Sequence, residues 1–392
     1  MNHSIDTAHG HWDIFCTVID NYGDIGVTWR LAKQLTHDFG IQVTLWVDCL
    51  ASFHCILPQL DPGALTQQHD GVTIEHWQTP FIQTWQPGNV LIEAFACELP
   101  NEIKAQWPAL PDKPLWINLD YLSAEQWVDD CHGLPSLLPN GQVRYFFFPG
   151  FSAKSGGLIC EHDLFKQQHH WLNNATLQHE WLHRLGFEHL GTKVADATYI
   201  SVFSYPSQAL TALSHLWQQG SNPIHLLIPF GQSLESLKWM LADNDTDFII
   251  GHSYQASMLH VHVLPMTIQE DFDKLLWYCD INIVRGEDSF LRAQWAKKPF
   301  IWHIYPQQEA AHLDKLTAFM AHYCQPLACE TAEIWQALCL AFNQDDTDAS
   351  QHYWPLLQEH IVEMNQHAKK WPQQALNEGD LATRLVNFVK KG

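Results

Sequence analysis

Short apolar runs alternate with helix-like segments along the chain, and this alternation limits the possible fold more than any other feature. Strands that alternate with helices build parallel sheets whose faces are covered by those helices. The first part of the chain contains five runs typical of buried strands, at residues 12–19, 42–47, 90–94, 115–119 and 143–148. We therefore predict an α/β domain, with a helix at residues 27–39 after the first strand.

The alternation starts again in the second part of the chain. Five further runs are predicted as strands, at residues 198–204, 224–228, 261–264, 281–284 and 300–304. Helices are predicted from Pro206 onward and at residues 270–278, 288–296 and 308–322. These features predict a second parallel sheet with crossover helices, and a ligand bound at the carboxyl ends of the strands.

The length of the chain bounds the number of domains. At roughly 150 residues per domain, 392 residues correspond to two or three domains. A mainly helical stretch separates the two series of strands, and a further helix-like stretch ends the chain. We predict an N-terminal domain at residues 1–160, a connection at 161–195, a C-terminal domain at 196–371 and a closing helix at 372–392.

The composition excludes several classes of function. With 43 acidic and 21 basic side chains, the formal net charge is −22, which disfavours binding to nucleic acid or anionic membranes. The ten cysteines show no zinc-binding spacing and the 25 histidines form no H-E-x-x-H motif, so we expect no metal site. A signal-like N-terminus and an apolar run of about 20 residues are both missing, so we expect a cytoplasmic protein.

The turn after the first predicted strand is acidic, where a nucleotide-binding turn is normally rich in glycine. Its sequence, DNYGDIG at residues 20–26, places Asp20 and Asp24 between a strand and a helix. A Rossmann turn instead presents backbone N–H groups to a pyrophosphate. Two carboxylates repel phosphate, so we interpret this turn as the place of a general base or of a bound cation. The structural alternative makes Asp24 a helix cap and Asp20 a turn residue.

A second charged turn has the sequence RGEDS and begins at Arg285, directly after a predicted strand. Arg285 offers a planar fork to phosphate oxygens, and Ser289 with nearby helix amides can donate further hydrogen bonds. Glu287 repels phosphate but can accept hydrogen bonds from sugar hydroxyls. The combination predicts a site for a sugar diphosphate. In the structural alternative, Asp288 or Ser289 caps the helix and Arg285 pairs with Glu287.

Two other patterns are less specific. Asp271 and Asp273 match a metal-binding D-x-D pattern, but they begin a predicted helix, where acidic residues are favourable without a metal. Phe203 and Tyr205 follow the first strand of the second series, where they could stack on a base or belong to the core.

Several long stretches resemble the bacterial elongation factor P arginine rhamnosyltransferase family. They are WDIFC at residues 12–16, VIDNYGDIG at 18–26, IEAFACELP at 92–100, FFPGF at 147–151 and NIVRGEDSF at 282–290. The resemblance covers almost the whole chain. It implies a GT-B fold of two Rossmann-like domains facing across a cleft. It also implies an inverting, metal-independent enzyme that transfers L-rhamnose from dTDP-β-L-rhamnose to one arginine of elongation factor P, which supports translation through consecutive prolines.

The same resemblance implies roles for individual residues. Asp24 would be the general base, Asp20 an assisting carboxylate and Glu287 the second essential acid. Contacts to the donor would come from Arg285, Asp288, Ser289 and Gln269. The aromatic pocket around thymidine would consist of Phe203, Tyr205 and Phe272. Met266 stands where the resemblance implies a further aromatic residue. Apart from the donor substrate, no cofactor is implied.

The chemistry of the residues is compatible with these roles. A guanidinium has a pKa above about 12, so it is a poor nucleophile until carboxylates bind it, orient one nitrogen and take its proton. Two other enzymatic functions stay open at this point, namely a nucleotide-sugar epimerase of the GT-B class and a glycosyltransferase with a glycan or lipid acceptor. A non-enzymatic docking protein for elongation factor P with a degenerate nucleotide pocket is the third alternative.

Overall fold

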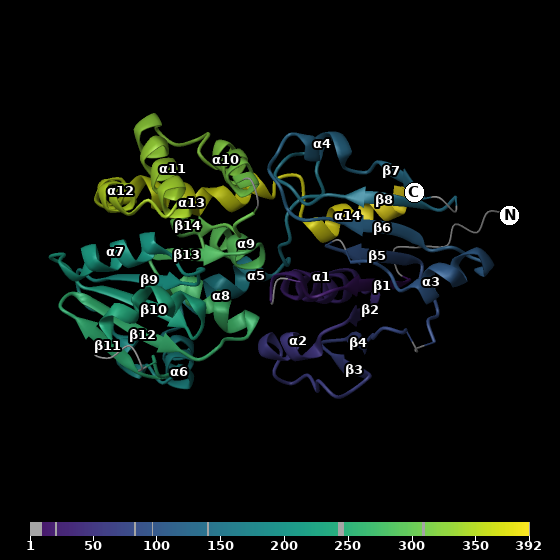
Figure 1. Cartoon of the computed structure of the whole chain (residues 1–392), viewed down its shortest axis with the longest axis horizontal. Coiled ribbons are helices and arrows are strands. Elements are labelled where there is room, and N and C mark those ends of the chain that lie inside the picture. Colours follow the sequence, from purple (N-terminus) through teal and green to yellow (C-terminus); the bar gives the residue numbers. More distant parts are fainter. Residues whose placement is uncertain are drawn as a thin grey trace. The chain divides into compact units, whose positions relative to one another are not determined.

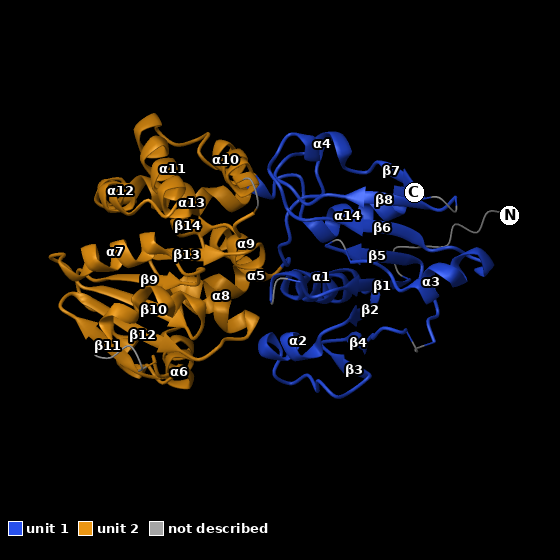
Figure 2. Ribbon diagram, viewed as in Figure 1, with its two compact units in different colours: residues 1–162, 375–392 blue, residues 163–374 orange. Residues whose placement is uncertain are grey.

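The computed structural model describes residues 10–19, 22–81, 84–95, 97–138, 141–241, 247–307 and 310–391. It divides into two compact units, unit 1 (residues 1–162 and 375–392) and unit 2 (residues 163–374) (Figure 2). The last helix, α14 (Leu381–Lys391), belongs to unit 1 (Figure 2). Two helices in the stretch expected as a connection, α5 (Leu164–Leu172) and α6 (Ala175–Leu185), belong to unit 2.

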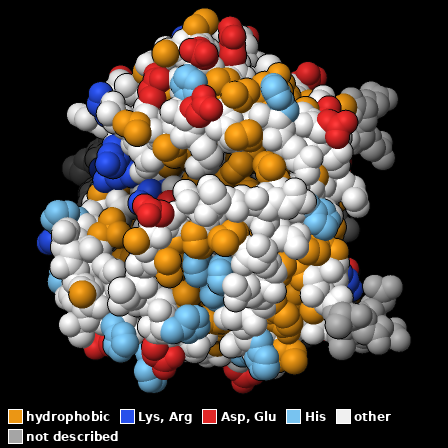
Figure 3. Space-filling view, turned by 90° about the vertical axis from the view of Figure 1, so that its left-hand side faces the viewer, with side chains coloured by type: hydrophobic (Ala, Val, Ile, Leu, Met, Phe, Trp, Pro, Cys, Tyr) orange, Lys and Arg blue, Asp and Glu red, His pale blue; other side chains and the backbone are white. Residues whose placement is uncertain are grey.

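The surface is consistent with the acidic composition. On the side of the molecule shown in Figure 3, apolar, acidic and histidine side chains are interspersed, and lysine and arginine form only small patches. Within the described ranges, no helix is both long and apolar enough to cross a bilayer.

Unit 1 is built on an eight-stranded sheet in the order β3-β4-β2-β1-β5-β6-β8-β7. The strands are β1 (His11–Cys16), β2 (Gln42–Val47), β3 (Thr66–His69), β4 (Val72–His76), β5 (Val90–Ala94), β6 (Leu115–Leu119), β7 (Pro135–Leu137) and β8 (Val143–Phe147). All are parallel except the outermost β3 and β7. Numbered along the chain, the parallel strands lie in the Rossmann order 3-2-1-4-5-6. The five predicted strands are confirmed, although the first ends at Cys16 and not at residue 19. The short strands β3, β4 and β7 lack a continuous apolar run and were not predicted.

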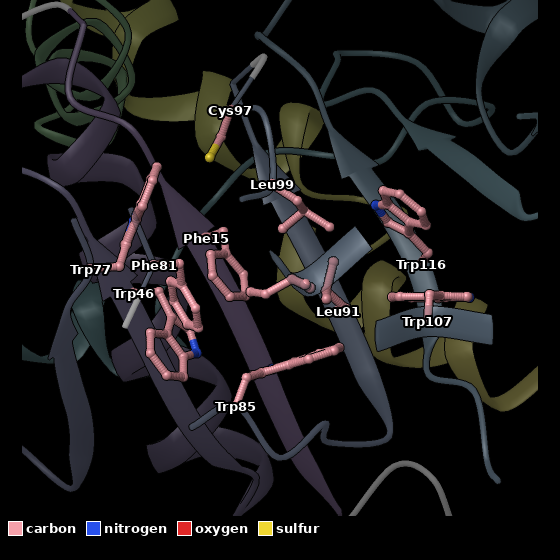
Figure 4. Packing of buried hydrophobic residues seen from close by; sticks show 11 residues of the cluster. Phe15, Trp46, Trp77, Phe81, Trp85, Leu91, Cys97, Leu99, Trp107 and Trp116 are labelled. Atoms are coloured by element: carbon pink, nitrogen blue, oxygen red, sulfur yellow. The ribbon is translucent and has the colours of Figure 1, made fainter. Parts of the chain in front are cut away.

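The two faces of this sheet are packed differently. One face is covered by α1 (Gly23–Phe39) and α14, whose Phe388 ring contacts Tyr145 and Phe147 of β8. The other face carries a cluster of buried aromatic and aliphatic side chains (Figure 4). In that cluster the Phe15 and Trp46 rings are stacked with their centroids 5.3 Å apart. The remaining helices of unit 1 are α2 (Leu50–Ile56), α3 (Asn101–Gln106), η2 (Trp107–Ala109) and α4 (Trp127–Cys131).

Helix α1 begins earlier than the sequence predicts. The apolar spacing placed its start at residue 27, but the first turn is formed by Gly23 and the residues that follow it. The helix ends at Gly40, which takes a left-handed conformation with φ of 68° and donates its N–H to carbonyls of the last turn. Asp24 therefore lies inside the first helical turn, and not in the loop before the helix.

Unit 2 contains a six-stranded sheet in the order β11-β12-β10-β9-β13-β14. The strands are β9 (Thr198–Val202), β10 (Ile224–Pro229), β11 (Ser253–Ala256), β12 (Leu259–Leu264), β13 (Ile281–Arg285) and β14 (Phe300–His303). Among these described strands, only β11 pairs antiparallel. The parallel strands follow the order 3-2-1-4-5, so both units use the same topology around their first strand.

Helices cover both faces of the second sheet, as predicted (Figure 1). Besides α5 and α6, the described helices of unit 2 are η3 (Glu188–Gly191), α7 (Gln208–Gln218), η4 (Gln232–Met240), α8 (Gln269–Tyr278), α9 (Asp288–Trp295), α10 (Ala311–Tyr323), α11 (Cys329–Asn343), α12 (Thr347–Glu359) and α13 (Ile361–Ala375). The prediction that a helix starts at Pro206 is wrong by two residues, because Ser207 is the N-cap and its hydroxyl accepts the N–H of Leu210. The last three helices were not predicted; α11 packs on α7 and β14, and α12 packs on α7.

Candidate active site

Asp24 is buried at the carboxyl end of β1. Its side chain is 3% exposed, and its Oδ2 accepts the backbone N–H of Ile19 at 2.9 Å. The N-cap of α1 is Tyr22, which makes no side-chain cap, so the interpretation of Asp24 as the capping residue is wrong. A carboxylate in the first turn of a helix is favoured by the helix dipole, and the hydrogen bond to Ile19 fixes its direction. Asp20, the other carboxylate of the motif, lies outside the described residues.

The neighbourhood of Asp24 contains two buried thiols that are not reactive. Cys16 ends β1, and Cys97 follows β5, where its Sγ accepts the hydroxyl of Thr17 at 3.3 Å. Burial raises the pKa of the Cys97 thiol to about 12 and raises the pKa of Cys16 above its usual value, with the charge of Asp24 adding to the latter shift. Both thiols are therefore protonated at neutral pH, and neither is suited to act as a nucleophile.

A cavity of about 500 Å³ lies in unit 1, beside the aromatic cluster. Its walls include Glu93, Trp116 and Arg144. The Glu93 carboxylate is 2% exposed and accepts hydrogen bonds from Trp116 Nε1 and Arg144 Nη1, both at 2.9 Å. These bonds satisfy a charge that burial would otherwise destabilise. Of the predicted site residues that the structure describes, none lines this cavity.

Arg285 is the last residue of β13, and its guanidinium lies against two aromatic rings. Its Cζ is 4.5 Å from the ring centroid of Phe203 and 4.8 Å from that of Tyr205. Phe203 and Tyr205 follow β9, which pairs with β13, so the topology of the sheet brings the three side chains together. The guanidinium also donates from Nη1 to Gln232 Oε1 at 2.9 Å. The site thus combines a cation with aromatic surfaces at the point where the strand order of unit 2 reverses.

Glu287 is held by a lysine and not by the arginine of its own turn. Lys315 Nζ of α10 lies 3.0 Å from Glu287 Oε1, and both side chains are 17% exposed. No carboxylate of the described residues is within ion-pair distance of Arg285. The expected alternative of an Arg285–Glu287 pair is therefore wrong. Gly286 between them has a φ of 62°, a left-handed conformation that favours glycine.

The hydroxyl of Ser289 is bound to the backbone of its own turn. Ser289 Oγ accepts the N–H of Arg285 at 3.1 Å and donates to the carbonyl of Arg285. Asp288 begins α9 and is half-buried. The N-cap of α9 is Glu287, which makes no side-chain cap, so the expected alternative of a cap by Asp288 or Ser289 is also wrong. Ser289 instead stabilises the backbone conformation at Arg285 through these hydrogen bonds.

Gln269 and Phe272 lie on the first turn of α8, which follows the carboxyl end of β12. The Phe272 ring meets the Phe203 ring edge-on, with centroids 5.4 Å apart, so Phe272 joins the aromatic group. Gln269 begins the helix and is 5% exposed. Met266, in the loop between β12 and α8, is 36% exposed.

The two acidic residues of the D-x-D pattern are both paired with cations. Asp273 binds Arg292 through two hydrogen bonds, Nε to Oδ1 at 2.8 Å and Nη2 to Oδ2 at 2.7 Å. Asp271 lies 2.7 Å from Lys274 and 3.1 Å from Arg184. These contacts give the pattern a structural role. In the described part of the chain, no group of acidic, histidine or cysteine side chains is arranged to hold a metal ion.

Several residues of this region were missed by the sequence analysis. Gln232 and Lys315 lie far along the chain from the RGEDS turn, and neither is part of a recognisable pattern. The His303 and Tyr305 rings flank Tyr205, at centroid distances of 5.3 and 5.6 Å. Burial lowers the pKa of His303 to about 4, with the charge of Arg285 as a smaller contribution in the same direction. His303 is therefore neutral at pH 7.

Comparisons with known proteins agree over the full length of the chain. A family model described as Elongation-Factor P (EF-P) rhamnosyltransferase EarP matches residues 12–390. A protein-arginine rhamnosyltransferase from Shewanella oneidensis is 51% identical over 396 residues and covers 99% of this chain and 100% of that protein. The protein-arginine rhamnosyltransferase from Pseudomonas aeruginosa is 42% identical and covers 96% of this chain and 98% of that protein.

A solved structure shares the fold. It is described as the structural basis for EarP-mediated arginine glycosylation of translation elongation factor EF-P. It is 33% identical, with a TM-score of 0.68, and the match covers 98% of this chain and 99% of that one. The prediction of a GT-B fold with two Rossmann-like domains is confirmed. The chain therefore belongs to the EarP family, the elongation factor P rhamnosyltransferases.

Proposed function

We propose that this protein transfers L-rhamnose from dTDP-β-L-rhamnose to one arginine of elongation factor P, with inversion at the anomeric carbon. The observation that carries this proposal is the group formed by Arg285, Phe203 and Tyr205 at the carboxyl edge of unit 2. Such a group suits a nucleoside diphosphate, because a guanidinium binds phosphate oxygens and aromatic rings stack on a base. The family supplies the identity of the sugar and of the acceptor.

In this proposal unit 2 holds the donor. Arg285 and the N-terminal amides of α9 bind the diphosphate and stabilise it as it leaves. The thymine is enclosed by Phe203, Tyr205 and Phe272. Further donor contacts come from Gln269, Asp288 and Ser289. Glu287 accepts hydrogen bonds from the sugar hydroxyls, which places it beside the anomeric carbon as the second essential acid.

Unit 1 supplies the base. Asp24, with Asp20 as its assistant, accepts hydrogen bonds from the arginine of the acceptor and orients one nitrogen toward the anomeric carbon. The new C–N bond forms while the bond between the anomeric carbon and the diphosphate oxygen breaks. The proton of the attacking nitrogen passes to Asp24, and dTDP leaves. A single displacement of this kind inverts the anomeric centre.

No metal ion or other cofactor is needed in this scheme, because fixed cationic and amide donors stabilise the leaving group. The modification activates elongation factor P for translation of consecutive prolines, and the reaction takes place in the cytoplasm.

The test is intact-mass analysis of purified elongation factor P after incubation with this protein and dTDP-β-L-rhamnose in the presence of EDTA. The expected result is an added mass of one deoxyhexose, located on arginine by fragmentation. NMR of the modified peptide then reports the anomeric configuration, which should be α. An unchanged mass, with donor binding still detectable by calorimetry, would contradict the proposed acceptor and favour an epimerase or a glycan or lipid acceptor.

A further inference from the structure

Arg285 and Glu287 carry opposite charges and are separated only by Gly286. Two such groups attract each other more strongly in a partly desolvated site than in water. An arginine that is paired with a carboxylate offers much less positive charge to a phosphate, and the carboxylate offers less negative charge to a sugar hydroxyl. A site that needs both groups must therefore keep them apart.

The structure contains a separate partner for each group. Lys315 reaches Glu287 from the second turn of α10, at 3.0 Å and with only 17% of either side chain exposed. This contact is charge-assisted and partly screened from water, so it is stronger than a surface ion pair. Lys315 makes no contact with a second carboxylate among the described residues.

Gln232 holds Arg285 in a different way. Its amide oxygen accepts from Nη1 at 2.9 Å, while the Cζ of the guanidinium lies over the rings of Phe203 and Tyr205. An amide orients the guanidinium without neutralising it. Of the five N–H donors of the arginine, Gln232 occupies one, and within the described residues no other side chain accepts from the rest. Those donors are left for a ligand.

We propose that Lys315 and Gln232 are positioning residues that keep the opposite charges of the RGEDS turn separated, so that Arg285 stays available to the diphosphate of the donor. The inference rests on the proposed function, because it concerns how the same donor site is kept ready. Lys315 acts by retaining Glu287, and Gln232 acts by aligning Arg285 against the aromatic rings. Neither residue needs to touch the reacting atoms.

The experiment measures the Kd of dTDP by isothermal titration calorimetry, because dTDP carries the diphosphate but no sugar for Glu287 to bind. In Lys315→Met, Glu287 loses its contact with the lysine and is attracted to Arg285, so dTDP should bind roughly tenfold more weakly or worse. In the double variant Lys315→Met with Glu287→Gln, position 287 no longer carries a charge that could capture Arg285, and affinity should return to within about twofold of the wild type. Lys315→Arg should retain the affinity.

Gln232 is tested by a substitution of the same shape. Gln232→Glu places a carboxylate on Arg285, so dTDP should bind more weakly, although the hydrogen bond between the two side chains is kept. The matched control is Lys193→Met. Lys193 pairs with Asp280 at 3.1 Å, and Asp280 precedes the opposite end of β13. This variant should leave the Kd unchanged.

The outcomes separate this inference from the function on which it rests. If the wild type fails to bind dTDP, the proposed donor is wrong. If the wild type binds and folded Lys315→Met binds equally well, the proposed role of Lys315 is overturned. A double variant as weak as Lys315→Met would also overturn it, because the loss would then come from a disturbed α10 and not from Glu287. Thermal unfolding curves identify any variant that has lost its fold.

Discussion

Units 1 and 2 have the same strand order around their first strand, but they carry opposite charges where that order reverses. In unit 1 the group at this point is Asp24, a buried carboxylate held by a backbone N–H. In unit 2 it is Arg285, a cation lying on aromatic rings. The topology of a Rossmann-like unit thus determines where a site lies, and the side chains placed there determine which chemistry is possible.

The two units also differ in how they use their acidic residues. The carboxylate of Asp24 accepts a backbone N–H, a neutral donor that leaves the negative charge in place. In unit 2, Asp271, Asp273 and Glu287 are all paired with lysine or arginine. A bound cation stabilises a carboxylate in its charged form, so these three residues of unit 2 are poorly suited to take a proton.

The largest effect should come from Asp24→Asn. The amide can still accept the Ile19 N–H but cannot take a proton, so transfer should fall by a factor of roughly 10² to 10⁴ while the Kd of dTDP stays unchanged. Single-turnover transfer, followed by mass spectrometry, measures this. Asp48→Asn is the matched control in the same unit, because Asp48 accepts the Val18 N–H at 2.9 Å. Wild-type turnover in Asp24→Asn would remove Asp24 from the mechanism.

The next effect tests whether the D-x-D residues of unit 2 are structural. Asp273→Ala removes the carboxylate that binds the buried Arg292 guanidinium, so the free energy of unfolding should fall by about 3 to 5 kcal/mol. Asp271→Ala breaks contacts with Lys274 and Arg184 that are more exposed, and it should cost at most about 1 kcal/mol. Urea unfolding compares the two variants. If both variants lost the same small amount of unfolding free energy and a divalent cation restored their activity, the pattern would instead be a metal site.

A smaller effect is expected for the cation of unit 2. Arg285→Met should weaken dTDP binding by about 1.5 to 3 kcal/mol, because a charge-assisted contact to the diphosphate is lost. Arg285→Lys should recover part of the affinity but not the planar stacking on Phe203 and Tyr205. Calorimetry with dTDP measures both variants. Arg184→Met is the control, since Arg184 is 55% exposed in its pair with Asp271. Unchanged affinity in Arg285→Met would show that the diphosphate binds elsewhere.

The smallest effect per residue concerns how the stability of each unit depends on pH. Burial lowers the pKa values of His225, His303 and His367 in unit 2 to about 4 and that of His262 to about 3, whereas in unit 1 the described residues include one such case, His132, at about 4. Because these groups bind protons more readily in the unfolded chain, their stabilising contribution is complete above about pH 6.5 and is lost as the pH falls toward 4.

By pH 6 each of these histidines should contribute a loss of at most about 1 kcal/mol, so unit 2 should lose more stability than unit 1. Hydrogen–deuterium exchange, corrected for the intrinsic effect of pH on exchange, can resolve the two units between pH 7.5 and 5. Equal loss of protection in both units would contradict the assignment.

Local patterns in the sequence were sufficient for most of the secondary structure. The runs at residues 42–47, 90–94 and 115–119 coincide with β2, β5 and β6, because a strand buried on both faces needs a short, continuous apolar run. The prediction was wrong at α1, which begins at Gly23, because apolar spacing does not report the first polar turn of a helix. Helices α11 to α13 were missed, and their apolar faces became evident only from the elements they cover.

The sequence likewise predicted one part of the candidate site and missed another. The charged turn that begins at Arg285 is visible in the sequence, because opposite charges and a glycine after an apolar strand are unusual. The residues that contact this turn are not visible in the sequence. Gln232 and Lys315 are ordinary residues of two helices, η4 and α10, and only their distances to Arg285 and Glu287 give them a role. A contact between residues far apart in the chain has no local signature.

By itself, the sequence determined that the chain is an α/β protein with two series of strands, an acidic turn near Asp24 and a charged turn at Arg285. It could do so because apolar periodicity and the chemistry of a turn are properties of neighbouring residues. Only the tertiary structure decided the order of the strands, the first turn of α1 and the separation of Arg285 from Glu287. These features depend on pairing and packing between distant segments, and such contacts are settled by the free energy of the whole fold.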